Sequence, residues 1–291
     1  MRVTDAQLHE VREVGFARIE GFIPAETLAE AQAALTQVFP KPADYFADPA
    51  VQAKFAKSQF AGIRQFPYNL PVFDRLAVLP GLVDAAERFL GSAELDIYKI
   101  ELWAKYAGAI DYDQPHHRDF GNHSLVVPHP DRPQLTTIML LSDVTEDHAP
   151  TCAVPLAHSR DVPAWPMILK PGELHEHEVV LTGAAGTLIL YQTHVLHRGS
   201  NFRAPEASRF IYMTDFKRRG DPWTGKHAWP DHAIRPGWSA ALAAMSVRER
   251  DLFGFPPPGS AYWTPETRAG VGARYPGMDM GAYGGEACSS H

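Results

Sequence analysis

Cysteine is scarce in this chain, which has two in 291 residues, Cys152 and Cys288. The two lie far apart and form no CxxC pair, so neither a disulfide scaffold nor a thiolate zinc site is indicated. Such scarcity is typical of a reducing compartment, and we expect a cytoplasmic location. The N-terminal sequence MRVTDAQLHEVREVG also lacks the apolar region of a signal peptide.

Long hydrophobic runs and nucleotide-binding motifs are also missing from the sequence. No stretch of about 18 apolar residues occurs, so no membrane-spanning helix is predicted. Neither a P-loop pattern nor the G-x-S-x-G pattern of serine hydrolases is found. The net charge is −7 with histidine neutral, and an acidic chain does not attract nucleic acid through its overall charge. These absences argue against a membrane protein and a nucleic-acid-binding protein.

The composition is that of an ordinary globular protein, with 45% hydrophobic and 21% charged residues. A chain of this length can bury a sizeable core, and we expect one domain over residues 1–291. Within it we predict a helical N-terminal part of about 1–90, a β core of about 95–220, and an irregular C-terminal extension of about 221–291.

Hydrophobic periodicity predicts the elements of these parts. The sequence from Thr4 to Gln7 has the form of a capping box, which predicts a helix to about Val14. Further helices are predicted near 23–38, 79–89 and 239–252, and residues 40–70 look irregular. Strand patterns occupy 16–20, 95–103, 135–141, 178–181, 186–191 and 208–213. Several short strands in succession indicate a β-sandwich or barrel, with the helices packed outside one sheet.

One short segment, Gln114–Phe120, carries the pattern QPHHRDF. In an extended chain, residues i and i+2 point to the same side, so His117 and Asp119 can reach one metal ion together. Two histidines and one carboxylate on one face of an ion leave three coordination positions open, as in non-haem Fe(II) oxygenases. A third ligand must therefore come from elsewhere in the chain.

The segment Tyr191–Asn201, which follows a strong strand pattern, offers His194 and His197 as the third ligand. Twelve residues after His197, on the next predicted strand, is Arg209. A guanidinium group can bind a carboxylate through two parallel hydrogen bonds, which is what the distal carboxylate of 2-oxoglutarate requires.

Taken in order, the motifs of residues 5–220 resemble the phytanoyl-CoA dioxygenase (PhyH) superfamily of Fe(II)- and 2-oxoglutarate-dependent oxygenases. The matching pieces are WAK at 103–105, His117-Arg118-Asp119, LTTIMLLSDVTED at 135–147, APTCAVPLAHS at 149–159, GTLILY at 186–191, the distal histidine, Asn201 and Arg209. The chain departs from the family pattern in having Leu156-Ala157 before His158. Ser200 and Arg209 are shifted together by one residue relative to the distal histidine.

This resemblance implies a mainly β protein with flanking helices and a double-stranded β-helix (jelly-roll, cupin-like) core. It also implies Fe(II) as the metal, with 2-oxoglutarate and O2 as co-substrates. The implied metal ligands are His117, Asp119 and His197; His197 is preferred to His194 because it lies nearer Asn201 and Arg209. The implied contacts to the distal carboxylate of 2-oxoglutarate are Arg209 and Ser200. Lys105 could contact 2-oxoglutarate or line the substrate pocket. Either Thr136 or Thr137 could bond a carboxylate of the co-substrate; strand alternation directs only one of them inward, and Thr136 is preferred.

The resemblance further implies a hydroxylase of a small organic metabolite that releases succinate and CO2. Because Asp119 is present, hydroxylation is favoured over halogenation, for which related enzymes keep that ligand position small. The alternative hypothesis is a cupin-like metal-binding protein or isomerase that lacks 2-oxoglutarate-dependent activity. Such a protein would keep the three ligands but would not need Arg209.

Overall fold

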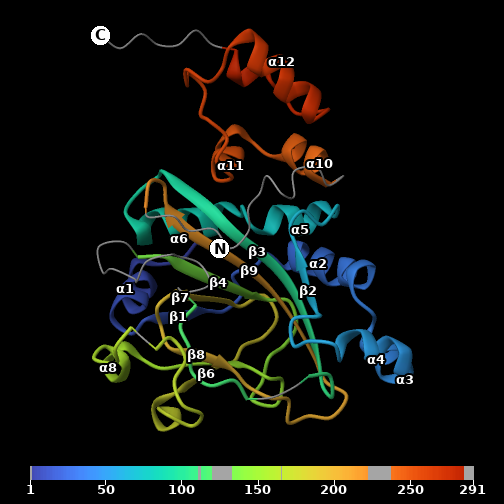
Figure 1. Ribbon diagram of the computed structural model, residues 1–291, viewed down its shortest axis with the longest axis vertical. Helices are drawn as coiled ribbons and strands as arrows, with labels where there is room; N and C mark the ends of the chain where they lie inside the picture. The colour runs from blue at the N-terminus through green and yellow to red at the C-terminus, as the bar shows by residue number, and fades with distance from the viewer. Residues whose placement is uncertain (1, 111–112, 120–132, 165, 222–236, 285–291) are drawn as a thin grey trace.

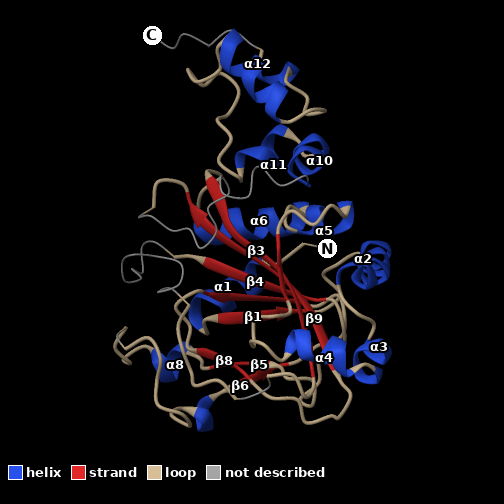
Figure 2. Cartoon of the chain, turned by 45° about the vertical axis from the view of Figure 1, so that its right-hand side comes forward, coloured by secondary structure: helices blue, strands red, loops and turns tan. Residues whose placement is uncertain are grey.

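Two antiparallel β-sheets form the centre of the molecule (Figures 1 and 2). The computed structural model describes residues 2–110, 113–119, 133–164, 166–221 and 237–284. The larger sheet has six strands in the order β1-β7-β4-β9-β3-β2, and the smaller has three in the order β6-β5-β8. The smaller sheet lies beneath the larger one in both views.

The strands are short except for two long ones that pair with each other. They are β1 (Phe16–Ile19), β2 (Ile63–Gln65), β3 (Leu95–Tyr106), β4 (Leu135–Leu140), β5 (Thr151–Ala153), β6 (Val179–Leu181), β7 (Leu188–Gln192), β8 (His197–Gly199) and β9 (Ser208–Arg218). The helices are α1 (Asp5–Glu13), α2 (Ala25–Val38), α3 (Pro42–Ala47), α4 (Pro49–Phe55), α5 (Pro71–Leu76), α6 (Pro80–Leu90), α8 (Leu156–Ser159), α10 (Gly237–Ala244), α11 (Val247–Asp251) and α12 (Pro265–Arg274), with 3-10 turns η1 (His175–His177) and η2 (Gly281–Tyr283).

Alternation along the strands gives the larger sheet two apolar faces. Leu102 and Tyr212 belong to the core that the helices cover. Ile138, Ile211 and Met213 point to the other side, where they pack with residues of the smaller sheet. Because successive strand residues point to opposite faces, this pattern determines which side chains face the interior between the sheets.

The helices begin at recognisable signals and cover the outer face of the larger sheet. Thr4 and Gln7 form the reciprocal hydrogen bonds of a capping box at the start of α1. Helix α6 ends at Gly91, which adopts the left-handed conformation with φ 68°. The longest described helix, α2, has 14 residues, and no helix in the described ranges is long and apolar enough to cross a membrane.

The mainly β architecture with flanking helices is confirmed. Each of the six predicted strand regions contains an observed strand, and β3 continues to Tyr106, three residues beyond the predicted end. The three-residue strands β2, β5 and β8 were not predicted, because they lack the run of β-branched and apolar residues by which the equally short β6 was recognised. The region 40–70 is less irregular than expected, since α3 and α4 each begin at a proline in the first helical turn.

The C-terminal part also contains more helix than its composition predicted. Residues 237–274 form three helices, α10, α11 and α12, which lie beyond α5 and α6 in Figure 1. The single helix predicted over 239–252 is divided in two, because Ser246 and Glu249 form a second capping box that starts α11. Trp238 and Leu242 are buried in the same core as the N-terminal helices. The limits predicted for the helical N-terminal part, the β core and the C-terminal extension stay a prediction.

A close approach at Gly62 gives a first prediction. A Cβ atom at this position would lie 1.8 Å from the carbonyl oxygen of Ala104, while the Gly62 carbonyl accepts a hydrogen bond of 3.0 Å from Ala104 N. Gly62→Ala should therefore lower the free energy of unfolding by about 2–3 kcal/mol, measured by urea denaturation. Gly270→Ala, in open space within α12, should raise it by about 0.5–1 kcal/mol. Equal stability of the Gly62 variant and the parent would contradict this packing.

Candidate metal centre

Two segments far apart in the sequence are held together by reciprocal backbone hydrogen bonds. His117 N donates to His197 O at 2.9 Å, and His197 N donates to His117 O at 3.0 Å. This antiparallel bridge places His117 directly opposite His197, the first residue of β8. Residues that form such a pair have their side chains on the same side, so both histidines point into the interior.

The side chains of His117, Asp119 and His197 converge at this bridge. His117 Nε2 lies 3.7 Å from Asp119 Oδ1, and His197 Nε2 lies 3.5 Å from Asp119 Oδ2. One potential ligand atom from each residue lies within 4.8 Å of the others. Metal–ligand bonds of about 2.1 Å separate neighbouring ligand atoms by roughly 3 Å, so small side-chain movements would bring all three onto one ion.

Backbone carbonyls orient both imidazole rings in the same way. His117 Nδ1 lies 3.0 Å from Pro115 O, and His197 Nδ1 lies 3.0 Å from Val195 O. Each Nδ1 therefore carries the proton, which leaves the Nε2 lone pair directed at Asp119. This is the tautomer that metal-binding histidines use. The donor set thus fits a divalent transition metal, with the remaining positions on one side free for other ligands.

Burial and neighbouring charges act on the two histidines in opposite ways. Burial lowers the pKa of His117, and the adjacent His197 lowers it further. Burial also opposes protonation of His197, but Asp119 outweighs this effect and raises the pKa of His197. The carboxylate is therefore the principal charge stabilising a cation at this position.

The residue between His117 and Asp119 points to the other side of the segment. Arg118 is buried, and its guanidinium donates to three backbone carbonyls, of His194 at 3.0 Å, Pro163 at 2.8 Å and Val162 at 3.0 Å. These bonds hold the segment firmly in place while its neighbours face the interior.

His194 does not lie with the His117–Asp119 pair. Its side chain instead lines a cleft of about 550 Å³ together with Arg118, Leu156 and Gln192. Burial, and then the charge of Arg118, lowers the pKa of His194 to about 4. Of the two histidines offered by the sequence, the structure brings His197 to the pair.

Three of the four residues predicted to contact 2-oxoglutarate lie together. Lys105 and Arg209 are direct partners across β3 and β9. Lys105 Nζ donates to Ser200 O at 3.0 Å, Ser200 Oγ donates to Pro150 O at 2.7 Å, and Arg209 Nη1 donates to Ala149 O. Ser200 follows His197 by three residues, roughly 10 Å along an extended chain, so this basic group lies near the metal centre.

Thr136, the fourth predicted contact, lies apart from the other three. It is the partner of Asp215 across β4 and β9, six residues along the strand from Arg209. Six strand residues span about 20 Å, so Thr136 and Arg209 cannot bind the same carboxylate. Thr136 faces the interior, where its hydroxyl lies 3.1 Å from that of Thr193.

A buried ion pair beside the metal centre was not predicted from the sequence. Lys99 Nζ lies 2.8 Å from Asp215 Oδ2, and both side chains are almost completely buried. Burial alone would lower the pKa of Lys99, but Asp215, followed by Glu101 and Asp119, raises it. Charged residues occur at alternate positions of β3, namely Lys99, Glu101 and Lys105, while the other face of this strand is apolar. This spacing was the sequence signal from which buried charges could have been predicted.

Comparison with known sequences gives a family match. A sequence model of the phytanoyl-CoA dioxygenase (PhyH) family matches residues 11–210. No curated protein sequence matches the chain.

Several solved structures are similar to this one. EctD from S. alaskensis with bound Fe is 21% identical with a TM-score of 0.58, covering 77% of this chain and 79% of that chain. HygX from Streptomyces hygroscopicus with iron bound is 15% identical with a TM-score of 0.54, covering 77% and 90%. The non-heme alpha ketoglutarate dependent epimerase SnoN from nogalamycin biosynthesis is 17% identical with a TM-score of 0.53, covering 74% and 80%. Identities this low show a common fold, and the predicted double-stranded β-helix is confirmed.

The Lys99–Asp215 pair yields a second prediction. Lys99→Met would leave the Asp215 carboxylate buried without its partner, and should lower the free energy of unfolding by about 3–5 kcal/mol. The double variant Lys99→Met/Asp215→Leu removes both charges and should recover most of that loss. Urea denaturation followed by circular dichroism measures both effects. A double variant as unstable as the single one would show that shape, not charge pairing, is what the site requires.

Proposed function

The chain belongs to the phytanoyl-CoA dioxygenase (PhyH) family, and on that premise we propose that it is an Fe(II)- and 2-oxoglutarate-dependent dioxygenase. The observation that carries the proposal is the convergence of His117, Asp119 and His197, with both imidazoles held in the metal-binding tautomer. When bound, Fe(II), 2-oxoglutarate and O2 supply oxidative decarboxylation, which releases succinate and CO2 and delivers one oxygen atom to a substrate.

The protein's part is to orient these groups. His117, Asp119 and His197 bind one side of the metal and leave the other positions to the co-substrates. Arg209 binds the distal carboxylate of 2-oxoglutarate, because a buried guanidinium can offer two parallel hydrogen bonds there. Ser200, the residue after β8, and Lys105 of β3 complete this carboxylate site. Thr136 lies too far along the sheet to contact this carboxylate, and its contact with another part of the co-substrate stays a prediction.

The proposed substrate is a small organic metabolite, and the proposed reaction is its hydroxylation. Similar structures include EctD with 2-oxoglutarate and 5-hydroxyectoine, and HygX with nickel, 2-oxoglutarate and hygromycin B. These ligands are small molecules, which supports the same class here. Asp119 occupies a ligand position that chloride would need in a halogenase, and this favours hydroxylation. Epimerisation, named for SnoN, is the reaction class to test beside it.

The binding of 2-oxoglutarate tests the proposal against a metal-binding protein without this activity. Iron-loaded protein should develop a visible charge-transfer band when 2-oxoglutarate is added without O2. Arg209→Ala should weaken this binding by roughly 10- to 100-fold, because a charge-assisted contact is lost. Arg203→Ala is the matched control, since its side chain is 70% exposed and should leave the affinity unchanged. No band with the parent protein would refute the proposed function; equal affinity of the Arg209 variant would refute the co-substrate's placement.

The two candidate distal histidines can be separated by substitution. His197→Ala should abolish stoichiometric binding of Fe(II) and the succinate formed from 2-oxoglutarate, because it removes one of three ligands. His194→Ala should retain both, since that side chain lines the cleft beside Arg118. Iron content by mass spectrometry and succinate by chromatography are the measurements. Loss of iron from the His194 variant alone would mean that the distal ligand is misassigned.

A further inference from the structure

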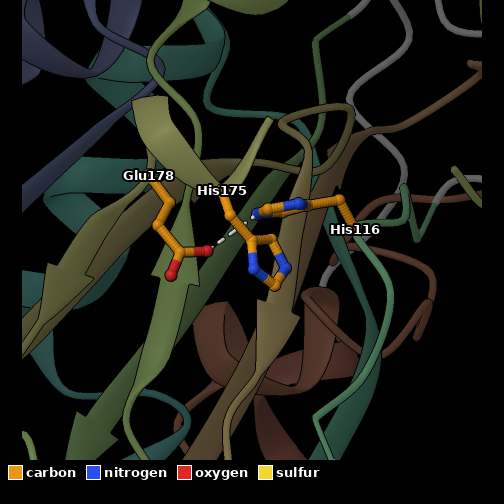
Figure 3. Close-up of side chains that lie close together, drawn as sticks. All are labelled: His116, His175 and Glu178. Carbon is orange, nitrogen blue, oxygen red and sulfur yellow. Dashed lines mark ion pairs between the residues drawn. The ribbon is translucent and has the colours of Figure 1, made fainter. Parts of the chain in front are cut away.

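A second cluster of ligand-type side chains lies outside the metal centre just described. It consists of His116, His175 of η1 and Glu178, the residue before β6 (Figure 3). One nitrogen or oxygen atom from each lies within 4.8 Å of the others. His116 is completely buried, while His175 and Glu178 are partly buried. Two separate segments therefore contribute to the cluster.

The orientation of His116 leaves a lone pair in need of a cation. Its Nδ1 lies 2.9 Å from the carbonyl oxygen of Glu173, so Nδ1 carries the proton. Its Nε2 then faces Glu178 Oε2 at 3.1 Å, the pair marked by the dashed line in Figure 3. A neutral imidazole nitrogen and a carboxylate oxygen repel each other at this distance unless a proton or a metal ion lies between them. Nitrogen and oxygen ligands of a tetrahedral zinc ion are separated by roughly 3.3 Å.

The charges around Glu178 favour a bound cation at the cluster. Arg198 already binds this carboxylate through two hydrogen bonds of 2.7 Å, from Nε and Nη2. Arg198 Nη1 also lies 3.1 Å from Asp113 Oδ1. The group thus has two carboxylates and one guanidinium, which leaves a net negative charge that a metal ion or a proton on His116 would neutralise.

His175 supplies the second, independent observation. Its Nε2 is buried and has no hydrogen-bond partner among the described residues. Its ring stands edge-on to that of His116, with 5.1 Å between centroids. An ion pair between His116 and Glu178 would give the His175 ring no role, whereas a metal ion bound by the cluster could take one of its nitrogens as a ligand.

We propose that His116, His175 and Glu178 bind a divalent transition metal ion of the zinc class, separate from the iron centre. Two imidazoles and one carboxylate are a ligand set used for Zn²⁺, and nitrogen ligands disfavour Mg²⁺ and Ca²⁺. The contact of Nδ1 of His116 with a backbone carbonyl is the support that metal-binding histidines typically have. Water completes the coordination.

The site fastens the loop before β6 to the segment that carries His117 and Asp119. Adjacent residues of an extended segment point to opposite sides, so His116 faces the second site while His117 faces the first. The same alternation on β8 directs His197 to the first site and Arg198 to Glu178. Occupancy of the second site therefore restrains both segments that supply the iron ligands.

Metal titration in a variant without the iron site tests this proposal. His117→Ala/Asp119→Ala protein, stripped with a chelator, should still bind one equivalent of Zn²⁺ in isothermal titration calorimetry. Adding His175→Ala should remove that equivalent. Adding His177→Ala instead should leave it, because that neighbouring ring stacks on His158, 4.2 Å away, outside the cluster. In the otherwise unchanged chain, His175→Ala should reduce total bound Zn²⁺ from two equivalents to one.

Thermal unfolding provides a readout that does not depend on activity. Zn²⁺ should raise the melting temperature of the His117→Ala/Asp119→Ala protein and leave that of the triple variant with His175→Ala unchanged. The proposal is overturned if the iron-site variant binds no Zn²⁺, or if His175→Ala leaves the stoichiometry unaltered. The charge-transfer band with iron and 2-oxoglutarate is measured on the same His175→Ala protein. If the band still forms, the proposed dioxygenase function stands even where the proposal of a second metal site fails.

Discussion

The reciprocal backbone pairing of His117 with His197 is the interaction on which the centre of the molecule depends. The two residues are 80 positions apart in the sequence, yet two hydrogen bonds of about 3 Å place their side chains opposite each other. Neither histidine alone, nor the local motif around Asp119, could assemble three ligands. Arg118 strengthens the arrangement from the outer side by binding three carbonyls of neighbouring loops. The geometry of the site is therefore set by the backbone, and the side chains add the chemistry.

Several charged side chains lie in the interior of the molecule, where an unpaired charge would strongly destabilise the fold. Lys99 and Asp215 pair at 2.8 Å, Trp103 Nε1 donates to Glu101 Oε2 at 2.9 Å, and Arg209 bonds a backbone carbonyl. Each charged group is expensive to bury, and each has a partner that offsets the cost. A polar interior of this kind suits the proposed binding of a metal ion and a dicarboxylate.

Much of the fold follows from the sequence, because alternation and capping are local signals. The long strands β3 and β9 and the capping box of α1 are of this type. The H-x-D spacing likewise predicted two ligands on one side of an extended segment. The choice of Arg209 as a carboxylate-binding residue, made from its place on the following strand, stays a prediction. The division of the C-terminal helix at Ser246 was missed, although its capping box with Glu249 is visible in the sequence.

Features that depend on pairing between distant segments could not be predicted. The position of Thr136 relative to Arg209 follows from the register of β4 with β9, which no local pattern reveals. The partnership of Lys99 with Asp215 joins residues 116 positions apart, and the cluster of His116 with Glu178 joins residues 62 positions apart. In each case the residue types were apparent, but their proximity is a property of the sheet and its loops.

The alternation of His116, His117, Arg118 and Asp119 makes the length of this segment a strict constraint. If one residue were inserted between Pro115 and the bridge to His197, the sides would exchange, and Arg118 would face the interior in place of Asp119. A guanidinium beside His197 would repel any cation there. Evolution of this chain can therefore vary the surrounding loops in length, but the spacing between Pro115 and Asp119 admits substitution without insertion or deletion.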